Sequence, residues 1–396
     1  MASFDVDAVR KQFPALAEGA AHFDGPGGSQ TPQAVADAVS ATMTAALANR
    51  GRLTAAERRA DEIVLGARQA VADLLGADPG GIVFGRSMTQ LTYDFSRTLA
   101  KAWGPGDEVV VTRLDHDANI RPWVQAAEAV GATVRWLEFD PSTGELDDVA
   151  PLLSSRTRLV AVTGASNLIG TRPDLAAISR LVHEAGALLY LDGVHLTPHH
   201  PVDAAVADFY ACSPYKFFGP HCGVLSAKPS LLEGLRPDKL LPATEVVPER
   251  FELGTLPYEL LAGTTAAVDF LAGLGGTGAT RRERLTGSLA LLESYEEELR
   301  VELEERLAEL DGITLHGRAA RRTPTLLFSV AGYEPQAVAA KLAEQGVNAP
   351  AGSFYALEAS RHLGLGDTGA VRAGLAPYTD RSDVDRLVEA VARIGS

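Results

Sequence analysis

A lysine and an aspartate 24 positions apart stand out in this sequence because of the chemistry that they could perform together. Asp192 ends an apolar run at 187–191 that has the composition of a buried strand. Lys216 follows a second apolar run, at 207–212, and precedes a Gly-Pro turn. The chain has only six lysines against thirty arginines, so a lysine among aromatic residues indicates an amine used for chemistry. Buried lysines change pKa readily and form Schiff bases with carbonyl compounds.

Short apolar runs alternate with amphipathic segments over the first 225 residues, and these elements must position the two residues. Continuous apolar strands between helices are typical of an α/β fold with a mostly parallel sheet covered by helices on both faces. We expect strands at 82–84, 109–111, 133–137, 159–163, 187–191 and 207–212, and helices at 32–48, 55–76, 90–99, 120–130, 146–153 and 175–185.

Polar residues follow four of these strands, at the edge where ligands bind in open α/β sheets. They are Asp115 and His116, Ser166 and Asn167, Asp192 and His195, and Ser213 and Lys216. Because the carboxyl ends of parallel strands meet at one edge, this convergence is a stronger signal than any single motif.

The pattern changes after position 225 and indicates a second, smaller α/β domain. Residues 229–258 hold five prolines, and a long charged helix is expected at 280–310. Strands at 326–330 and 371–375 then alternate with helices at 335–345 and 381–394. We expect an N-terminal helix within 1–20 that packs with the small domain, a large domain at 21–258, and a linking helix with the small domain at 259–396.

Charge and composition exclude several classes of protein. The net charge of −15 argues against nucleic acid or an anionic membrane as a partner. No run approaches the roughly 20 apolar residues that span a bilayer, and the acidic N-terminus does not have the pattern of a signal peptide. Cys212 and Cys222 form no disulfide framework and no metal cluster. We therefore expect a soluble cytoplasmic protein with a small-molecule substrate and no metal.

Two loops are candidates for ligand contacts. Residues 85–89 join a short strand to a helix through a small polar turn, where backbone N–H groups, the helix dipole and the hydroxyl of Thr89 can bind an anion. The Gly/Pro stretch at 21–29 has two interpretations, a plain turn or the rim of an active site.

These residues together meet the needs of pyridoxal phosphate. That cofactor requires a carboxylate for its pyridine nitrogen, an anion pocket for its phosphate and a flat group for its ring, in addition to a lysine. Asp192, the Thr89 turn with Ser213, and His116 suit these tasks.

The sequence resembles the class V aminotransferase family of fold-type I pyridoxal phosphate enzymes, in its cysteine desulfurase-like branch, nearly end to end. This resemblance implies a large domain with a mostly parallel, seven-stranded sheet and a smaller C-terminal α/β domain. The resemblance lies in residues 114–119 (LDHDAN), 166–170 (SNLIG), 192–195 (DGVH), 213–220 (SPYKFFGP), 251–255 (FELGT) and 371–375 (VRAGL).

The resemblance implies three catalytic residues. Lys216 forms the Schiff base and later moves the substrate α-proton, Asp192 binds the pyridine nitrogen, and His116 stacks on the ring. The other implied cofactor contacts are Asn167 and His195 near the ring hydroxyl, and Met88, Thr89, Ser213 and Tyr215 at the phosphate end. His195 stands where the desulfurases usually carry glutamine, and Tyr215 where they usually carry histidine.

Substrate and partner contacts are implied in the same way. Arg372 clamps the substrate α-carboxylate, a bidentate task suited to guanidinium, and Asn167 and Tyr355 complete the substrate contacts. Thr255 reaches the phosphate of the neighbouring subunit, which implies a homodimer with shared sites.

The sequence departs from the desulfurase pattern at one decisive place. Desulfurases carry a nucleophilic cysteine on a loop of the C-terminal domain, but residues 346–356 contain none, and Tyr355 stands at about that position. A phenol cannot form a persulfide. Our first hypothesis is therefore a carbon–sulfur β-lyase for a cysteine S-conjugate, with Phe354 and Tyr355 favouring a bulky or aromatic one. An aminotransferase, an epimerase, a decarboxylating deaminase and a non-catalytic scaffold remain alternatives.

Each candidate also has a plain structural explanation when it is taken alone. Asp192 could cap a helix, His116 could be a capping residue, and Arg372 could be an ion-pair partner. We interpret the neighbouring histidines His199 and His200 as structural or rim residues.

Overall fold

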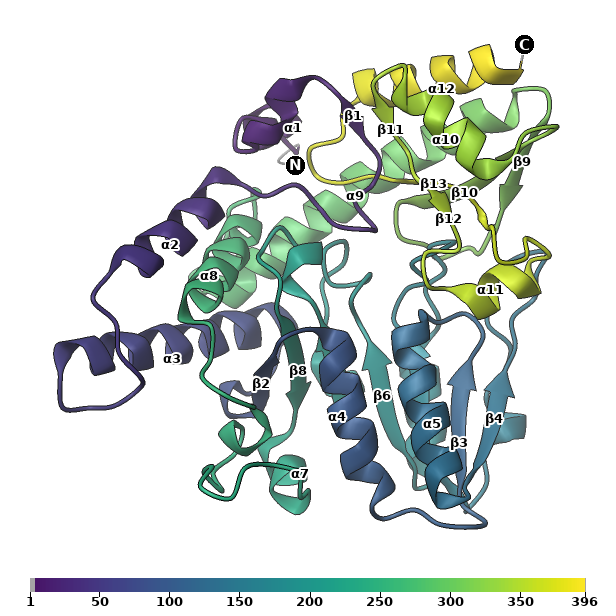
Figure 1. Cartoon of the computed structure of the whole chain (residues 1–396). Helices are drawn as coiled ribbons and strands as arrows, with labels where there is room; N and C mark the ends of the chain where they lie inside the picture. Colours follow the sequence, from purple (N-terminus) through teal and green to yellow (C-terminus); the bar gives the residue numbers. More distant parts are fainter. Residues whose placement is uncertain (1–3, 396) are drawn as a thin grey trace.

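The large part of the molecule is built on a seven-stranded sheet, shown in the computed structural model of Figure 1, which describes residues 4–395. The strand order is β2-β8-β7-β6-β5-β3-β4. Six strands run parallel, and β8 runs antiparallel to both of its neighbours. The strands are β2 (Ile82–Gly85), β3 (Glu108–Thr112), β4 (Thr133–Leu137), β5 (Thr157–Thr163), β6 (Leu188–Asp192), β7 (Phe209–Cys212) and β8 (Gly223–Ala227).

Both faces of this sheet are buried, which explains why its strands are apolar without interruption. Successive side chains of a strand point to opposite faces, so Leu189 and Leu191 enter one core and Tyr190 enters another. Helices α4 and α5 cover the Tyr190 face, and α3, α6, α8 and α9 supply the other core. The helices of this part are α2 (Gln33–Thr44), α3 (Ala55–Leu75), α4 (Met88–Ala100), α5 (Arg121–Val130), α6 (Leu175–Glu184), α7 (Pro229–Gly234) and α8 (Tyr258–Ala272).

A smaller four-stranded antiparallel sheet, ordered β12-β13-β10-β9, forms the second part. Its strands are β9 (Ile313–His316), β10 (Thr325–Val330), β12 (Ala351–Gly352) and β13 (Ala370–Gly374), and its helices are α10 (Pro335–Ala343), α11 (Leu357–His362) and α12 (Arg381–Gly395).

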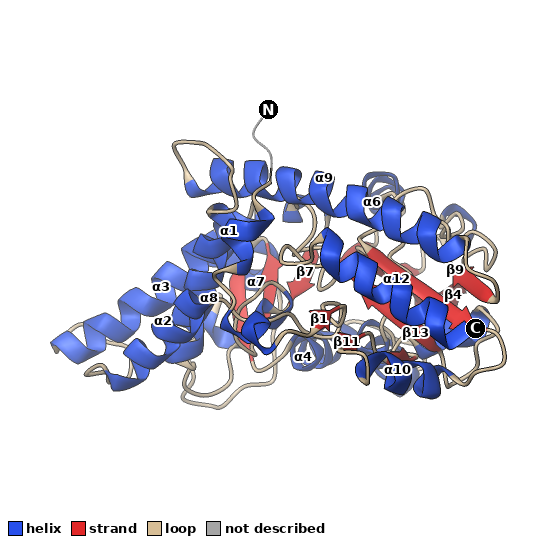
Figure 2. Cartoon of the chain, turned by 90° about the horizontal axis from the view of Figure 1, so that it is seen from above, coloured by secondary structure: helices blue, strands red, loops and turns tan. Residues whose placement is uncertain are grey.

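The long helix α9 (Arg281–Ala308) joins the two parts, as Figure 2 shows. Its first half places Leu285, Leu289 and Leu292 in the core of the large part. Its second half places Leu303 and Leu307 in the core of the small part. One continuous helix therefore packs into the cores of both parts and connects them.

The N-terminal segment also contacts both parts. In α1 (Val6–Arg10), Arg10 lies 2.6 Å from Asp383 and 3.1 Å from Asp380 of the small part. Phe13, three residues after the helix, belongs to the core of the large part. The strand β1 (Ala21–His22) pairs with β11 (Val347–Asn348). The division of the chain at positions 20 and 258 stays a prediction.

One expected helix is wrong. Residues 146–153 contain only a short 3₁₀ turn, Ala150–Leu152. Pro151 lies inside the segment, where its ring excludes the α-helical hydrogen bond, and the Asp148 side chain accepts the Ala150 N–H at 3.0 Å instead. Across residues 4–395, we find no helix with the length and apolarity needed to cross a membrane.

Gly223 permits a close approach that shapes one end of the sheet. A Cβ there would lie 2.6 Å from the nitrogen of Met88 and closer still to the carbonyl of Ser87. We expect Gly223→Ala to lower the free energy of unfolding by about 2–3 kcal/mol through overpacking. Gly66→Ala is the matched control, since Gly66 lies within α3 with open space around it, and it should stabilise by about 0.5–1 kcal/mol. Urea unfolding measures both, and equal effects would contradict the prediction.

Candidate active site

A cavity of about 670 Å³ opens at the carboxyl edge of the parallel strands, where the small part meets the large one. Eleven of the twelve predicted site residues line it: Met88, Thr89, His116, Asn167, Asp192, His195, Ser213, Tyr215, Lys216, Tyr355 and Arg372. Of the eight residues expected to converge from four strands, six line the cavity, and Asp115 and Ser166 do not.

Asp192 and Lys216 face this cavity from the ends of β6 and β7. Burial raises the pKa of Asp192 to about 6, although its carboxylate accepts the Val194 N–H at 2.9 Å and lies near the Lys216 charge. Burial, together with the charge of Arg372, lowers the pKa of Lys216 to about 7, while Asp192 opposes the shift. Lys216 Nζ donates to the carbonyl of Pro26. Such displaced pKa values are typical of functional sites.

His116 is a neutral, flat group in the same cavity. Burial, then the charges of Lys216 and Arg372, lower its pKa to about 4. Its Nδ1 accepts the Ala118 N–H at 3.0 Å, and its ring stacks on Tyr355 with centroids 5.5 Å apart and planes 24° apart. A neutral imidazole lying flat can cover the face of an aromatic ligand.

Arg372 reaches the cavity from β13 and is almost completely buried, at 1% exposure. It donates to the Asn167 carbonyl at 2.7 Å, and its guanidinium carbon lies 3.7 Å from the centre of the Phe354 ring. Burial lowers the pKa of Arg372 to about 9, opposed by Asp24. The stacked guanidinium is fixed in orientation before any ligand arrives.

The loop that carries Phe354 and Tyr355 is held in an unusual backbone conformation. Both residues have left-handed φ angles, 52° and 59°, which cost free energy in residues other than glycine. The Phe354 carbonyl accepts from the Asn167 side chain at 2.9 Å, and the Tyr355 carbonyl accepts from the Asp117 N–H at 2.7 Å. These contacts fix both aromatic rings at the mouth of the cavity.

The Met88–Thr89 end of the cavity is the N-terminus of α4. Ser87 caps that helix by accepting the Gln90 N–H at 3.1 Å, and the backbone N–H groups of a first helical turn have no partner within the helix. Ser213 and Tyr215 border the same cavity. A free helix N-terminus beside hydroxyl groups suits a phosphate.

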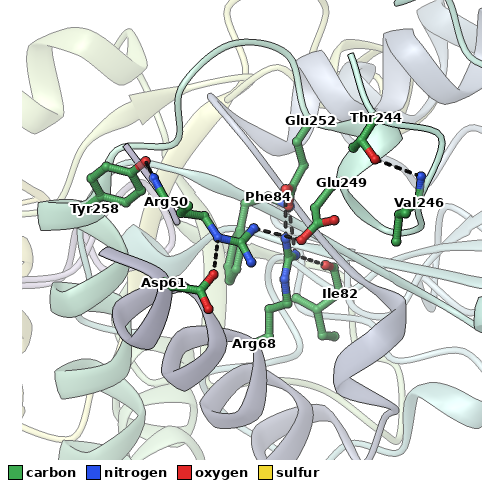
Figure 3. A network of polar contacts seen from close by, with 10 residues as sticks. All are labelled: Arg50, Asp61, Arg68, Ile82, Phe84, Thr244, Val246, Glu249, Glu252 and Tyr258. Atoms are coloured by element: carbon green, nitrogen blue, oxygen red, sulfur yellow. Dashed lines mark hydrogen bonds and ion pairs between the residues drawn. The ribbon is translucent and has the colours of Figure 1, made fainter. Parts of the chain in front are cut away.

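Thr255 is the one predicted site residue that lies outside this cavity. It is exposed, in the segment between residue 251 and α8. Two polar anchors hold that segment (Figure 3). In the outer anchor, Arg50 contacts Asp61 at 2.7 Å and Glu249 at 2.8 Å, and its N–H donates to the Tyr258 hydroxyl at 3.3 Å.

The inner anchor is a buried ion pair between Arg68 and Glu252, each 4% exposed (Figure 3). The two groups form two parallel bonds of 2.8 Å. Arg68 also donates to the Ile82 carbonyl, and Glu252 accepts the Phe84 N–H at 2.9 Å. Alternate residues of an edge strand point their backbone groups away from the sheet. The ion pair therefore takes the place of a further strand beside β2.

The cavity is also lined by residues that were not predicted from the sequence as site residues. Tyr93 lies one helical turn after Thr89, so the i, i+4 spacing could have indicated it. Asp117 and Arg121 border the cavity at the start of α5. Pro26 and Gly27 also line it, so the 21–29 stretch forms part of its rim. Conversely, Asp115 does not line it, because its carboxylate accepts from Asn119 at 2.7 Å and from the Thr163 N–H at 3.0 Å.

The cavity fits the cofactor that the resemblance implies. The Oδ1 of Asn167 and the Nε of Arg372 are buried, and within residues 4–395 neither has a hydrogen-bond partner. Such atoms are costly unless a ligand or water pairs with them. The cavity also has a group for each part of a phosphorylated pyridine aldehyde. The carboxylate of Asp192 suits the pyridine nitrogen, the N-terminus of α4 suits the phosphate, and Lys216 with its lowered pKa suits the aldehyde.

Comparisons of the sequence and of the structure with known proteins agree on one family. The family described as Aminotransferase class-V matches residues 21–387. An uncharacterized protein of Mycobacterium tuberculosis (strain CDC 1551 / Oshkosh), MT3887, is 36% identical over 99% of this chain and 100% of its own. Cysteine desulfurase CsdA of Escherichia coli (strain K12) is 32% identical over 98% of each chain. The crystal structure of the S-sulfonic acid form of that desulfurase has a TM-score of 0.86 at 31% identity, over 99% of this chain and 98% of the other.

The lowered pKa of Lys216 predicts its reactivity in the protein without a ligand. An amine reacts with an acylating reagent only when it is neutral, so the modification rate should rise with pH, reach half of its maximum near pH 7 and then level off. Mass spectrometry of the Lys216 peptide measures this rate, and the exposed Lys101 in the same digest is the reference. A rate still rising at pH 10 would contradict the prediction.

The inner anchor makes a prediction about stability. Glu252→Ala leaves Arg68 buried without its counter-charge and should lower the free energy of unfolding by about 3–5 kcal/mol. Glu249→Ala breaks a partly exposed pair of the outer anchor and should cost about 1 kcal/mol or less. The double variant Arg68→Met/Glu252→Leu should be more stable than Glu252→Ala. Urea unfolding that ranks the three variants otherwise would refute this account.

Proposed function

Because the chain belongs to the class V aminotransferase family, whose members are enzymes with pyridoxal 5'-phosphate as cofactor, we propose that it is a carbon–sulfur lyase for a cysteine S-conjugate. The observation that carries this proposal is the place of its cysteines. Cys212 and Cys222 are buried, at 0% and 2% exposure, and neither borders the cavity. Burial raises the pKa of Cys222 to about 11, which disfavours the reactive thiolate.

We assign the cofactor contacts as follows. Lys216 carries the covalent link, Asp192 pairs with the pyridine nitrogen, and His116 covers one face of the ring. The phosphate would bind at the N-terminus of α4, where we assign its contacts to Met88, Thr89, Ser213 and Tyr215. Asn167 and His195 would contact the ring hydroxyl. When bound, the cofactor withdraws electrons from the α-carbon of an amino acid and weakens the bonds to that carbon.

We assign the substrate carboxylate to Arg372. Its guanidinium is held by the Asn167 carbonyl and the Phe354 ring, so little conformational entropy is lost when a carboxylate binds. The unpaired Nε offers a donor for that carboxylate. Asn167 therefore holds this end of the site through two contacts, from its carbonyl to Arg372 and from its side-chain amide to the Phe354 carbonyl.

Lys216 Nζ is the group that we assign to the α-proton. A pKa near 7 allows an amine to take up a proton and to return it at neutral pH. Loss of the α-proton and departure of a thiolate from the β-carbon need no protein thiol, and the proton held by Lys216 balances the charge of the leaving group.

The mouth of the cavity favours a large S-substituent. Tyr93, Phe354 and Tyr355 border it, and the Tyr355 side chain is 76% exposed, so it lies at the entrance rather than in the depth. An aromatic or bulky conjugate can contact these rings. We further propose that the enzyme is a cytoplasmic homodimer in which Thr255 reaches the phosphate of the partner's site.

A product assay tests the proposal. S-substituted cysteines, cysteine, cystine and a panel of other amino acids are offered to the holoenzyme, and pyruvate, ammonia, keto acids and aldehydes are measured. We expect pyruvate from S-substituted cysteines, more from aromatic conjugates than from S-methylcysteine. Lys216→Ala should lower the rate at least about 10³-fold because it removes the acid–base group.

The same assay separates the alternatives. Keto acid or aldehyde from amino acids without a β-substituent, with no pyruvate from conjugates, would contradict the lyase and favour aminotransfer or decarboxylating deamination. Racemised amino acid without other products would favour an epimerase. A protein that stays colourless with pyridoxal 5'-phosphate would overturn the cofactor contacts.

A further inference from the structure

His195 is a buried side chain of the cofactor cavity, at 4% exposure, and its protonation decides what it can do there. An imidazole donates a hydrogen bond from a given nitrogen only in one tautomer, and a charged imidazole donates from both. Thr323, Thr325 and His199 contact His195 but do not line the cavity.

The first part of that set is a pair of threonines from the small part. His195 Nε2 lies 2.9 Å from the Thr325 hydroxyl and 3.0 Å from the Thr323 hydroxyl. Thr323 has a second acceptor within reach, the Gly170 carbonyl at 3.4 Å. Thr325 is fully buried, and within residues 4–395 its hydroxyl has no other side-chain or carbonyl partner than His195.

This arrangement selects one tautomer. A buried hydroxyl that donates to nothing costs about 1–3 kcal/mol. Thr325 therefore donates its proton to Nε2, which must then be an unprotonated acceptor. The proton of the neutral ring is left on Nδ1, the nitrogen that remains for the cofactor cavity.

The second part is a buried pair between His199 and Glu296. Nδ1 of His199 lies 2.8 Å from the carboxylate of Glu296, which sits on α9 and is 1% exposed. The other carboxylate oxygen of Glu296 has no hydrogen-bond partner among the described residues. Burial raises the pKa of Glu296, and His199 opposes that shift. Among the described residues, His199 is the hydrogen-bond partner of this buried carboxyl group.

His199 also lies directly beside His195. Their ring centroids are 5.4 Å apart, with the planes at 71°. Burial, then His199, Arg372 and Lys216, lower the pKa of His195 well below its ordinary value. Beyond Glu296, Glu293 is the next charge, and it is paired with His200 at 2.7 Å and Arg172 at 2.6 Å. Burial and these neighbouring groups therefore disfavour a second proton on the His195 ring.

We propose that Thr325, His199 and Glu296 are positioning residues that hold His195 as a neutral hydrogen-bond donor, with its proton on Nδ1 and available to the cofactor. A residue such as glutamine donates through its amide at any pH and needs no such support. The histidine at this position requires a fixed tautomer, which Thr325 of the small part provides. It also requires protection from protonation, which His199 provides while Glu296 of α9 holds it in place.

This inference rests on the cofactor site of the proposed function and not on cleavage of a carbon–sulfur bond. Its readout is the ¹⁵N chemical shifts of the histidine ring nitrogens in the holoenzyme, with His195→Gln used to assign the signals. These shifts distinguish the two neutral tautomers and the charged ring, and no turnover is needed. A protein without lyase activity can therefore still support or overturn the inference.

For the wild-type protein we expect the Nδ1–H tautomer of His195, and the ring should become charged only well below the pH at which an exposed histidine does. Thr325→Val removes the donor at constant shape and should move the signals toward the Nε2–H tautomer. Thr325→Ser restores the hydroxyl and should return the wild-type pattern. A wild-type ring protonated on Nε2, or a pattern unchanged in Thr325→Val, would overturn the inference.

Glu296→Gln tests the second part. Without the carboxylate, the His199 ring loses the 2.8 Å contact that holds it beside His195, so the titration of His195 should move upward, toward its ordinary range. His200→Gln is the matched control, because it removes the neighbouring histidine, whose partner is Glu293 and not Glu296. Equal titrations of His195 in both variants would overturn this part. His199→Gln provides the same test if Glu296→Gln does not fold.

Discussion

Burial of charged groups at the carboxyl edge of the sheet is the constraint on which the rest of this structure depends. Asp192, Lys216 and Arg372 border one cavity, and burial moves the pKa of each toward neutrality, to about 6, 7 and 9. Charges held out of water interact strongly with one another and with a ligand. The protein tolerates them because they are held near groups of opposite charge or bonded to backbone carbonyls, and because a ligand can pair the remaining atoms.

Holding these groups requires elements that are far apart in the sequence. The strands β6 and β7 deliver Asp192 and Lys216, whereas β13 delivers Arg372 from the small part. The helix α9 enters both cores and fixes the distance between the parts. The Arg68–Glu252 pair closes the open edge of β2 and so supports the strand that leads into the α4 N-terminus.

The sequence predicted what depends on local pattern. Uninterrupted apolar runs indicated a sheet buried on both faces, and the residues after four strands indicated the edge at which Lys216, Asp192, His116 and Asn167 meet. The structure departs where a local rule was overlooked, as with Pro151 inside the expected helix at 146–153. Contacts between residues far apart in the chain could not be predicted, because they depend on how the whole chain folds. No sequence pattern indicates that Thr325 contacts His195. None indicates that Phe354 has a left-handed φ angle and stacks on the Arg372 guanidinium.

We propose that this site cleaves carbon–sulfur bonds without a protein thiol. The most direct measurement is pyruvate formation from an S-substituted cysteine by the Cys212→Ala/Cys222→Ala variant, which has no cysteine at all. The account predicts a kcat/KM within about threefold of the wild type, equivalent to about 0.6 kcal/mol in transition-state stabilisation. Loss of pyruvate formation in a variant that is folded and binds pyridoxal 5'-phosphate as the wild type does would contradict it.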